Sequence, residues 1–226
     1  MKETILFCGY RDWAVDIFCS LLSSIRGEKY FVLAKNSKEL KDKLDQYKVS
    51  TILFIGWSWI IKEDIIDKYN CICLHPSPLP KYRGGCPIQH QILEGEEESA
   101  VTLFLMDKKV DHGPILWQKK FNLSGSLDSI FTEITSIGTQ GLLDIIKKYQ
   151  ELNNFDWGAE QNHEEATYYR RRKPEESEIK LRDWEGNSAK HIYNKIRALQ
   201  DPYPNAYIVC KDGTKLYLTE AKYDRD

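Results

Sequence analysis

The sequence predicts an α/β fold on a mainly parallel sheet, and two features of its first 75 residues carry that prediction. Short apolar segments alternate with amphipathic segments of helical period, which is the order expected when each strand is followed by a crossover helix. The apolar segments are continuous, which is typical of strands buried on both faces of a sheet. The expected strands are 4–8, 30–33, 51–55 and 71–74, and the expected helices are 13–25, 37–47 and 60–69.

Local signals support these elements in order. Gly9 and Gly56 end the first and third strands. Ser37 is expected to cap the second helix, which directs Leu40 and Leu44 toward the core. In the first helix, apolar residues recur at helical spacing, namely Ala14, Ile17, Phe18, Leu21, Leu22 and Ile25.

After residue 75 the pattern changes. A loop rich in proline and glycine precedes a short helix, two strands joined by a tight turn, and a long helix that Ser126 or Asp128 could cap. The expected bounds are 76–87 for the loop, 89–93 for the short helix, 101–106 and 115–121 for the strands, and 127–149 for the long helix.

These sequence signals divide the chain into three parts. We expect one α/β domain over 1–150, a polar linker that wraps the surface over 151–187, and a small subdomain over 188–226. The subdomain is predicted to contain a helix over 188–199 and strands over 206–210 and 214–219. Asp212-Gly213 between the strands is the pair preferred in two-residue hairpin turns.

Composition excludes several classes of protein. The 226 residues carry 32 basic and 34 acidic side chains, so the chain has no excess of positive charge that would attract nucleic acid. The apolar fraction of 42% is too high for a disordered chain. No apolar stretch approaches a membrane span, and the first residues do not form a signal peptide. The six cysteines lack the spacing of a disulfide framework, so a reduced, cytoplasmic setting is expected.

The most informative single residue is His75, at the end of the fourth predicted strand. Ligands of such sheets bind beyond the carboxyl ends of the strands. The prolines that follow His75 at alternate positions stiffen its backbone. Asp111, in the tight turn between two strands, is its natural partner, because a carboxylate orients an imidazole for general acid–base work. No GxGxxG or Walker loop is present, so no dinucleotide or ATP site is expected.

A metal site is the competing interpretation of the same segment. Cys71, Cys73 and His75 alternate along one strand and share a face, and Cys86 lies just beyond the loop. Next neighbours on one face of a strand lie about 7 Å apart, which is too far for easy ligation of one zinc ion. We favour cysteines that pack as small apolar residues and expect no metal.

Three motifs resemble the folate-dependent formyltransferases. Residues 75–85 read HPSPLPKYRGG and resemble that family's HPSLLPxYRG loop. Residues 106–116 are similar to its MDxxxDxGxIL segment. Residues 196–206 resemble the IRA…PxPGA stretch of methionyl-tRNA and sugar N-formyltransferases. The start, residues 5–12, also matches the first strand and turn, so the similarity runs from residue 1 to about 207.

The resemblance implies a Rossmann-like formyltransferase fold and transfer of a formyl group from N10-formyltetrahydrofolate to an amine. The family usually assigns catalysis to Asn, His and Asp. The His falls on His75, the Asp on Asp111, and the Asn position holds Cys73. A thiol is a poor hydrogen-bond donor. Either His75 and backbone N–H groups compensate, or the enzyme is slower, or it is inactive; we favour compensation.

The resemblance also implies binding residues. The donor is expected to contact Trp57, Ser77, Pro78, Leu79, Asp107 and Gly113. The acceptor is expected to contact Arg11, Lys81, Tyr82, Arg83 and Gly84, with Arg11 and Lys81 as partners of a pyrophosphate. The aromatic side chains that could stack on a nucleobase or flank the pterin are Trp13, Trp57, Tyr82 and Tyr203.

The expected acceptor is a nucleotide-linked amino-deoxysugar, dTDP- or GDP-linked and aminated at C4 or C3, whose product feeds a surface glycan such as an O-antigen. Methionyl-tRNA formyltransferases add a larger C-terminal domain, whereas this chain ends soon after its IRA…PYP segment and has no basic face. The basic run 170–173 is interpreted as a solvated turn or a contact to one phosphate. A methionyl-tRNA formyltransferase-like enzyme and an inactive folate- or nucleotide-binding homologue remain alternatives. The C-terminal helix and hairpin could pair two subunits in a homodimer or close the core.

Overall fold

The computed structural model describes residues 4–25 and 30–224. Its centre is a six-stranded sheet of order β2-β1-β3-β4-β6-β7. β2, β1, β3 and β4 run parallel, whereas β6 is antiparallel to both β4 and β7. The predicted mainly parallel α/β sheet is therefore confirmed. The strands are β1 (Thr4–Cys8), β2 (Tyr30–Ala34), β3 (Val49–Ile55), β4 (Asn70–His75), β6 (Glu98–Leu105) and β7 (Ile115–Asn122).

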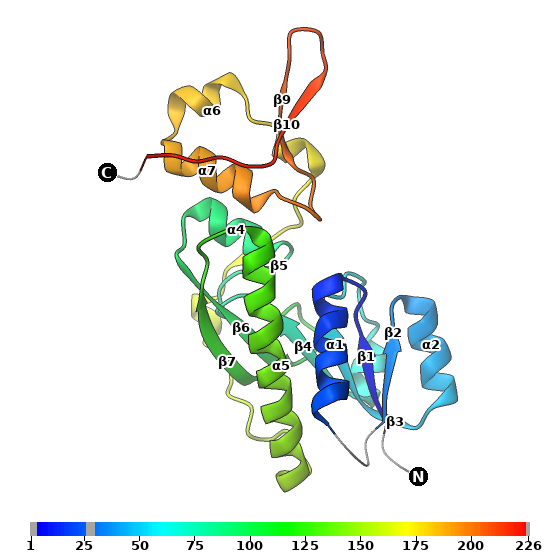
Figure 1. The fold of residues 1–226 in the computed structure, drawn as a ribbon. Helices are drawn as coiled ribbons and strands as arrows, with labels where there is room; N and C mark the ends of the chain where they lie inside the picture. Colours follow the sequence, from blue (N-terminus) through cyan, green and yellow to red (C-terminus); the bar gives the residue numbers. More distant parts are fainter. Residues whose placement is uncertain (1–3, 26–29, 225–226) are drawn as a thin grey trace.

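Helices cover both faces of the sheet, which explains the continuous apolar strands. Successive strand residues enter different cores: Leu53 and Leu74 pack with the cluster of α1 and α5, whereas Ile52 and Phe54 pack with the cluster of α2 and α3. Figure 1 shows α1 and α5 side by side in front of the sheet. The helices are α1 (Asp12–Ser24), α2 (Ser37–Gln46), α3 (Glu63–Lys68), α4 (Pro87–Glu94) and α5 (Leu127–Leu152).

Two helix starts differ from expectation and one expected cap is confirmed. Asn36, not Ser37, caps α2, because its side chain accepts a hydrogen bond from the Glu39 amide at 2.9 Å. The third helix begins at Glu63 and not at residue 60. Ser126 does cap α5, by accepting from the Ser129 amide at 3.2 Å.

The segment 151–187, expected as a linker, is hydrogen-bonded to the rest of the molecule. Its short strand β8 (Tyr168–Tyr169) pairs in parallel with β5 (Arg83–Gly84), inside the proline- and glycine-rich loop. Ala159 and Ile115 form an isolated antiparallel bridge. The segment therefore supports the loop that follows His75. Its other elements are η1 (His163–Glu165), η2 (Pro174–Ser177) and α6 (Leu181–Gly186).

The C-terminal residues form a small module with its own core (Figure 1). It contains α7 (Ala189–Ala198), β9 (Ala206–Val209) and β10 (Lys215–Leu218), as predicted in outline. The predicted two-residue turn is wrong. The Cys210 amide donates to the Thr214 carbonyl at 2.8 Å, and Gly213 has a φ of 82° while Asp212 has no positive φ. A type I′ turn needs both, so the connection is longer by at least one residue.

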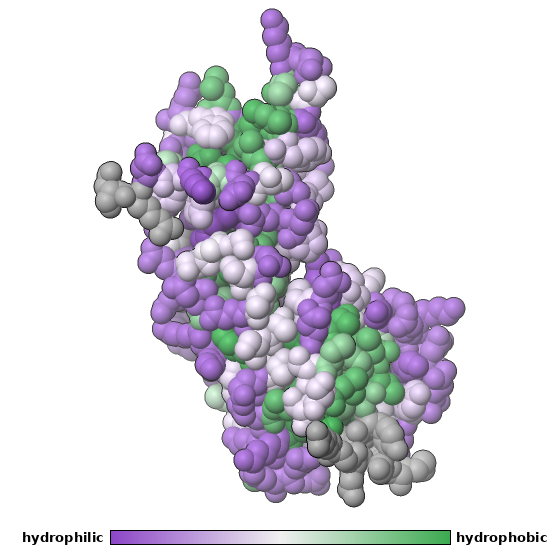
Figure 2. Space-filling model, viewed as in Figure 1, coloured by the Kyte–Doolittle hydropathy of each residue, from purple (hydrophilic) through white to green (hydrophobic). Residues whose placement is uncertain are grey.

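The surface is mostly polar in the view of Figure 2, with hydrophobic residues gathered over α1 and around the C-terminal module. Leu22 of α1 and Trp184 of α6 are among the exposed apolar side chains. Within the described residues, no helix combines the length and the apolar character that a membrane crossing requires.

Candidate functional site

A cavity of about 490 Å³ lies beyond the carboxyl ends of the parallel strands, where such sheets bind ligands. The loops after β1, β3 and β4 all contribute to its lining, as expected. The turn between β6 and β7 closes one side. Phe131 of α5, Arg171 and Tyr203 reach in from later segments.

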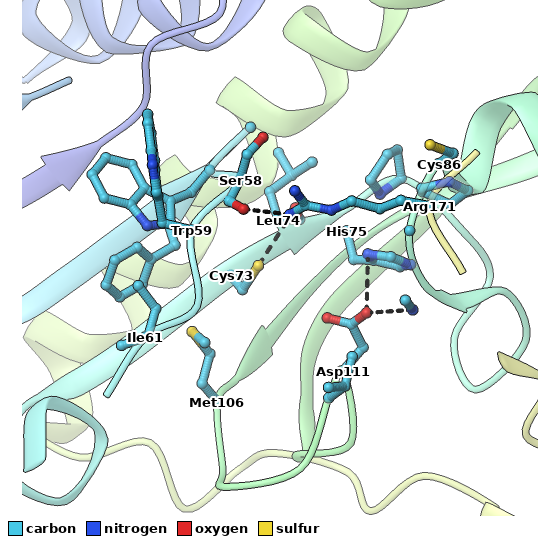
Figure 3. A pocket seen from close by; sticks show the side chains of 18 of the residues that line it. Ser58, Trp59, Ile61, Cys73, Leu74, His75, Cys86, Met106, Asp111 and Arg171 are labelled. Carbon is cyan, nitrogen blue, oxygen red and sulfur yellow. Dashed lines mark hydrogen bonds and ion pairs between the residues drawn. The ribbon is translucent and has the colours of Figure 1, made fainter. Parts of the chain in front are cut away.

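His75 is the last residue of β4 and is only 6% exposed. Its Nε2 lies 2.8 Å from the Tyr82 carbonyl oxygen, which can only accept a hydrogen bond, so Nε2 carries a proton. Its Nδ1 lies 3.6 Å from Oδ2 of Asp111 (Figure 3). Both ring nitrogens therefore face oxygen acceptors, Nε2 within hydrogen-bond distance and Nδ1 slightly beyond it.

Asp111 occupies the β6–β7 turn with a left-handed φ of 49°, which is uncommon outside glycine. Its Oδ2 accepts a hydrogen bond from the Gly84 amide at 2.7 Å, which fixes the direction of the carboxylate. The turn is held from behind by Gln161, whose side-chain amide donates to the carbonyls of Asp111 and Gly113. A Cβ on Gly113 would lie 1.9 Å from the Leu105 carbonyl oxygen, so only glycine fits there.

Cys73 lies on the same face of β4 as His75, and Figure 3 shows it between the His75–Asp111 pair and Met106. Burial, with a smaller contribution from the Asp111 carboxylate, raises the pKa of its thiol well above the ordinary value. The group is therefore a neutral thiol at neutral pH. Its Sγ lies 3.7 Å from the Leu74 carbonyl oxygen, a weak contact.

Within the 75–86 loop, the residues expected to bind ligands divide into two groups. Gly84 lines the cavity, with His75 at the start of the segment. Six residues expected there do not line it. The residues that the structure keeps away from the cavity are Ser77, Pro78, Leu79, Lys81, Tyr82 and Arg83, together with Gly113 of the β6–β7 turn.

Internal hydrogen bonds explain where these side chains lie. The Ser77 hydroxyl donates to the Lys81 carbonyl, and Ser77 is fully buried. Tyr82 stacks on Tyr169 and donates to Glu94 and Glu96, so its ring is unavailable for a nucleobase.

Arg83 is the largest fully buried side chain of the described residues. Its guanidinium donates to Gln161 Oε1 at 2.6 Å and to the Tyr168 hydroxyl at 2.6 Å, and one nitrogen lies 2.9 Å from His163 Nδ1. Arg83 therefore fastens the loop to segment 161–168. Through Gln161 the same network reaches the turn that carries Asp111.

Other expected residues do line the cavity: Arg11, Trp57 and Asp107, and the aromatic residues Trp13 and Tyr203. Sequence reasoning missed several more. The loop after β3 supplies Ser58, Trp59, Ile60 and Ile61, the β6–β7 turn supplies Met106, and the basic run supplies Arg171. For Arg171 the sequence offered only an ambiguous basic run, because its approach depends on the distant pairing of β5 with β8.

The two sides of the cavity differ in chemistry. One side, here named the apolar wall, consists of Trp57, Trp59, Ile61 and Met106. The rings of Trp57 and Trp59 lie 4.7 Å apart in an edge-on contact. Figure 3 shows Trp59, Ile61 and Met106 across the cavity from His75 and Asp111. The arrangement can hold a flat apolar group against a buried acid–base pair.

The described residues contain no group of three or more His, Cys, Asp or Glu side chains placed to hold a metal ion. Cys86, the fourth ligand of the metal interpretation, instead accepts a contact from the Arg172 amide at 3.5 Å.

Family profiles, related sequences and solved structures all point to the same family. A profile of the Formyl transferase family matches residues 24–135, and a profile of the Formyl transferase C-terminal domain matches residues 172–226. The methionyl-tRNA formyltransferase of Thermosynechococcus vestitus is 32% identical over 190 residues, which cover 82% of this chain and 54% of that protein. The chain thus spans about half the length of the curated relatives it matches.

Solved structures share the fold. The methionyl-tRNA formyltransferase from Clostridium thermocellum superposes with a TM-score of 0.79 at 26% identity, over 95% of this chain and 96% of that one. A 4-N formyltransferase from Francisella tularensis gives a TM-score of 0.78 at 15% identity, over 100% and 99% of the two chains.

Proposed function

The chain belongs to the formyltransferase family, and from that premise we propose that it moves a formyl group from N10-formyltetrahydrofolate to the amine of a nucleotide-linked amino-deoxysugar. The observation that carries the proposal is the buried His75–Asp111 pair beside a cavity with an apolar wall. The resemblance of the loop and aspartate motifs to the family, described above, assigns catalysis to these two residues.

The reaction needs a neutral amine to attack the formyl carbon. A new C–N bond forms, the carbonyl oxygen becomes an oxyanion, and the bond from carbon to N10 of the folate then breaks. Nε2 of His75 is already bonded to the Tyr82 carbonyl, whereas Nδ1 lies 3.6 Å from Asp111, too far for a hydrogen bond; an N–H at Nδ1 therefore donates to the oxyanion, where such stabilisation has its largest effect. Asp111, oriented by the hydrogen bond from the Gly84 amide, accepts the proton that the amine loses, and N10 takes up a proton as it leaves.

The donor fits the apolar wall. A pterin is a flat ring that stacks on aromatic side chains, and Trp57 and Trp59 offer such surfaces next to Met106. The residues would hold the formyl donor with its reacting carbon toward Cys73 and His75. Cys73 stands where the family resemblance expects an asparagine, so the oxyanion relies on His75 and backbone N–H groups.

A small anionic acceptor is supported by the cavity's size and by the arginines at its edge, Arg11 and Arg171. The 4-N formyltransferase from Francisella tularensis has the same fold over its whole length. A methionyl-tRNA acceptor is the second candidate, favoured by the curated relatives and by the structure from Clostridium thermocellum. The dTDP or GDP group, the role in surface glycan synthesis, the cytoplasmic location and the homodimer stay predictions.

The test is an incubation of the purified protein with N10-formyltetrahydrofolate and a panel of dTDP- and GDP-linked sugars carrying a 4- or 3-amino group, with methionyl-tRNA in a parallel reaction. Mass spectrometry should find one formyl group added to a sugar nucleotide. Formylation of methionyl-tRNA and of no sugar nucleotide would reject the amino-sugar acceptor in favour of methionyl-tRNA. Folate binding without transfer to any acceptor would instead identify an inactive homologue.

A further inference from the structure

We infer that Arg11 and Arg171 form an anion subsite for the diphosphate of a nucleoside diphosphate. The inference rests on the proposed function, because it names the part of the acceptor that the edge of the same cavity recognises. The two arginines are distant in the sequence: Arg11 precedes α1, and Arg171 follows β8. Both line the cavity that contains His75 and Asp111.

Neither arginine has an acidic partner among the described residues, although the chain is rich in acids. The two aspartates that line the cavity are engaged elsewhere, Asp111 with His75 and Gly84, and Asp107 with His112. A cavity with two unneutralised guanidinium groups attracts an anion. The positive charges of Arg11 and Arg171 therefore face the cavity and take no part in a structural ion pair among the described residues.

Each guanidinium is held in place while most of its donors stay free. Arg11 lies 5.4 Å from the ring centroids of both Tyr10 and Tyr203, which leaves the N–H groups at its edge unused. Arg171 donates one hydrogen bond to the Ser58 carbonyl and extends across the cavity (Figure 3). A guanidinium has five N–H donors, so further contacts remain available.

The backbone is shaped to admit Arg171. A Cβ on Gly85 would lie 2.5 Å from Cγ of Arg171, so the glycine leaves room for the arginine stem. Neighbours in the same basic run are used differently: Arg170 pairs with Glu176, and Arg172 donates to the Glu176 carbonyl. Only the middle arginine of the three lines the cavity.

Two planar, forked cations at one edge match the chemistry of a diphosphate, because a guanidinium binds phosphate oxygens in pairs. Lysines nearby are less suited to this role. Lys108 is paired with Glu63 and Asp67, and Lys109 lies exposed on the turn. A diphosphate anchored by Arg11 and Arg171 leaves the attached amino sugar to extend toward His75 and Asp111.

The test measures binding of dTDP, GDP and inorganic pyrophosphate by calorimetry, since none of these probes carries an amine and none can react. Arg11→Gln and Arg171→Gln should each weaken binding of both nucleotides about tenfold to hundredfold, because each removes a charge-assisted contact. Arg171→Lys should give an intermediate loss. Arg170→Gln, a neighbouring arginine already paired with Glu176, is the matched control and should change affinity less than about twofold.

Steady-state kinetics with a sugar that the enzyme formylates should show a raised KM for the acceptor and an unchanged kcat and folate KM in Arg171→Gln. Thermal unfolding checks that the variants are folded. If the folded variants bind nucleotides as tightly as the unmodified protein, the inference is overturned, even if formyl transfer to a sugar is found. Loss of affinity for methionyl-tRNA with no effect on nucleotides would also overturn it. Arginine-dependent nucleotide binding without any formyl transfer would uphold the subsite and reject the proposed function.

Discussion

Two histidine–aspartate pairs lie near the β6–β7 turn, and the closer pair is not the one inside the cavity. His112 Nδ1 lies 2.5 Å from Asp107 Oδ2, whereas His75 Nδ1 lies 3.6 Å from Asp111 Oδ2. The His112 ring also stacks on His163 at 3.9 Å between centroids. His112 does not line the cavity, although Asp107 does.

The difference shows that the shorter of two histidine–aspartate distances does not identify the pair at the cavity. In the Asp107–His112 pair, the two side chains contact each other and the imidazole ring also stacks on His163. The His75–Asp111 pair is more deeply buried and is shared with the Tyr82 carbonyl and the Gly84 amide. Its longer distance leaves capacity for a reacting group between the two side chains, as expected before a substrate tightens the geometry.

The largest expected effect separates the two pairs directly. Asp111→Asn and His75→Ala should each lower kcat for formyl transfer by about 10²- to 10⁴-fold, because the first removes the proton acceptor and the second the donor to the oxyanion. His112→Ala is the matched control and should retain kcat within about threefold. A His112→Ala loss as large as that of His75→Ala would reverse the assignment of the two pairs.

The next effect concerns the support that holds the Asp111 turn. Gln161→Ala should lower the free energy of unfolding by about 1–3 kcal/mol, because it removes one acceptor of the buried Arg83 guanidinium and the donor to the two turn carbonyls. Urea denaturation measures the change. Asn162→Ala is the control: this exposed neighbour bonds only within its own short turn and should cost less than about 1 kcal/mol. Equal losses in the two variants would contradict a supporting role for Gln161.

A smaller and opposite effect is expected beside the buried pair. Cys73→Asn supplies amide donors near the developing oxyanion, so kcat should stay equal or rise by up to about 10²-fold, the lower end of the effect of one such donor. Cys73→Ala should change kcat less than about threefold, since a thiol donates weakly. A strong fall in kcat for a stably folded Cys73→Asn variant would mean that the thiol itself matters.

The smallest effect is the pH dependence of stability near the second pair. Burial, aided by the charges of His112 and Arg83, lowers the pKa of His163 below its ordinary value of 6.5. The unfolded chain then binds a proton at higher pH than the folded chain, so stability is full above pH 6.5 and falls as the pH drops below it. His163→Asn should flatten the melting temperature between pH 7 and 5.5. Some slope should remain, because burial lowers the pKa of His90 in the same direction; an unchanged slope would count against His163.

The sequence was sufficient where the signal is local. Continuous apolar runs predicted strands buried on both faces, and the structure divides successive residues such as Ile52 and Leu53 between two cores. A proline-stiffened loop after β4 and a turn before β7 pointed to His75 and Asp111, which the structure brings to 3.6 Å. Strand periodicity also put Cys73 on the face of His75.

The sequence failed where a side chain's direction depends on distant backbone. Tyr82 and Arg83 belong to the recognisable motif, yet they do not line the cavity, because Gln161, Tyr168 and Glu94 provide their partners. Nothing within a few residues of the motif specifies those contacts.

By itself, then, the sequence determined the layered sheet, the edge at which ligands bind and the resemblance that singles out one histidine and one aspartate. Only the tertiary structure decided which half of the motif loop faces the cavity and which arginine of the run at 170–172 enters it. The reason is physical: periodicity and turn chemistry act over a few residues, whereas the pairing of β5 with β8 joins backbone 85 residues apart, from Arg83 to Tyr168. That pairing sets the direction of every side chain around it.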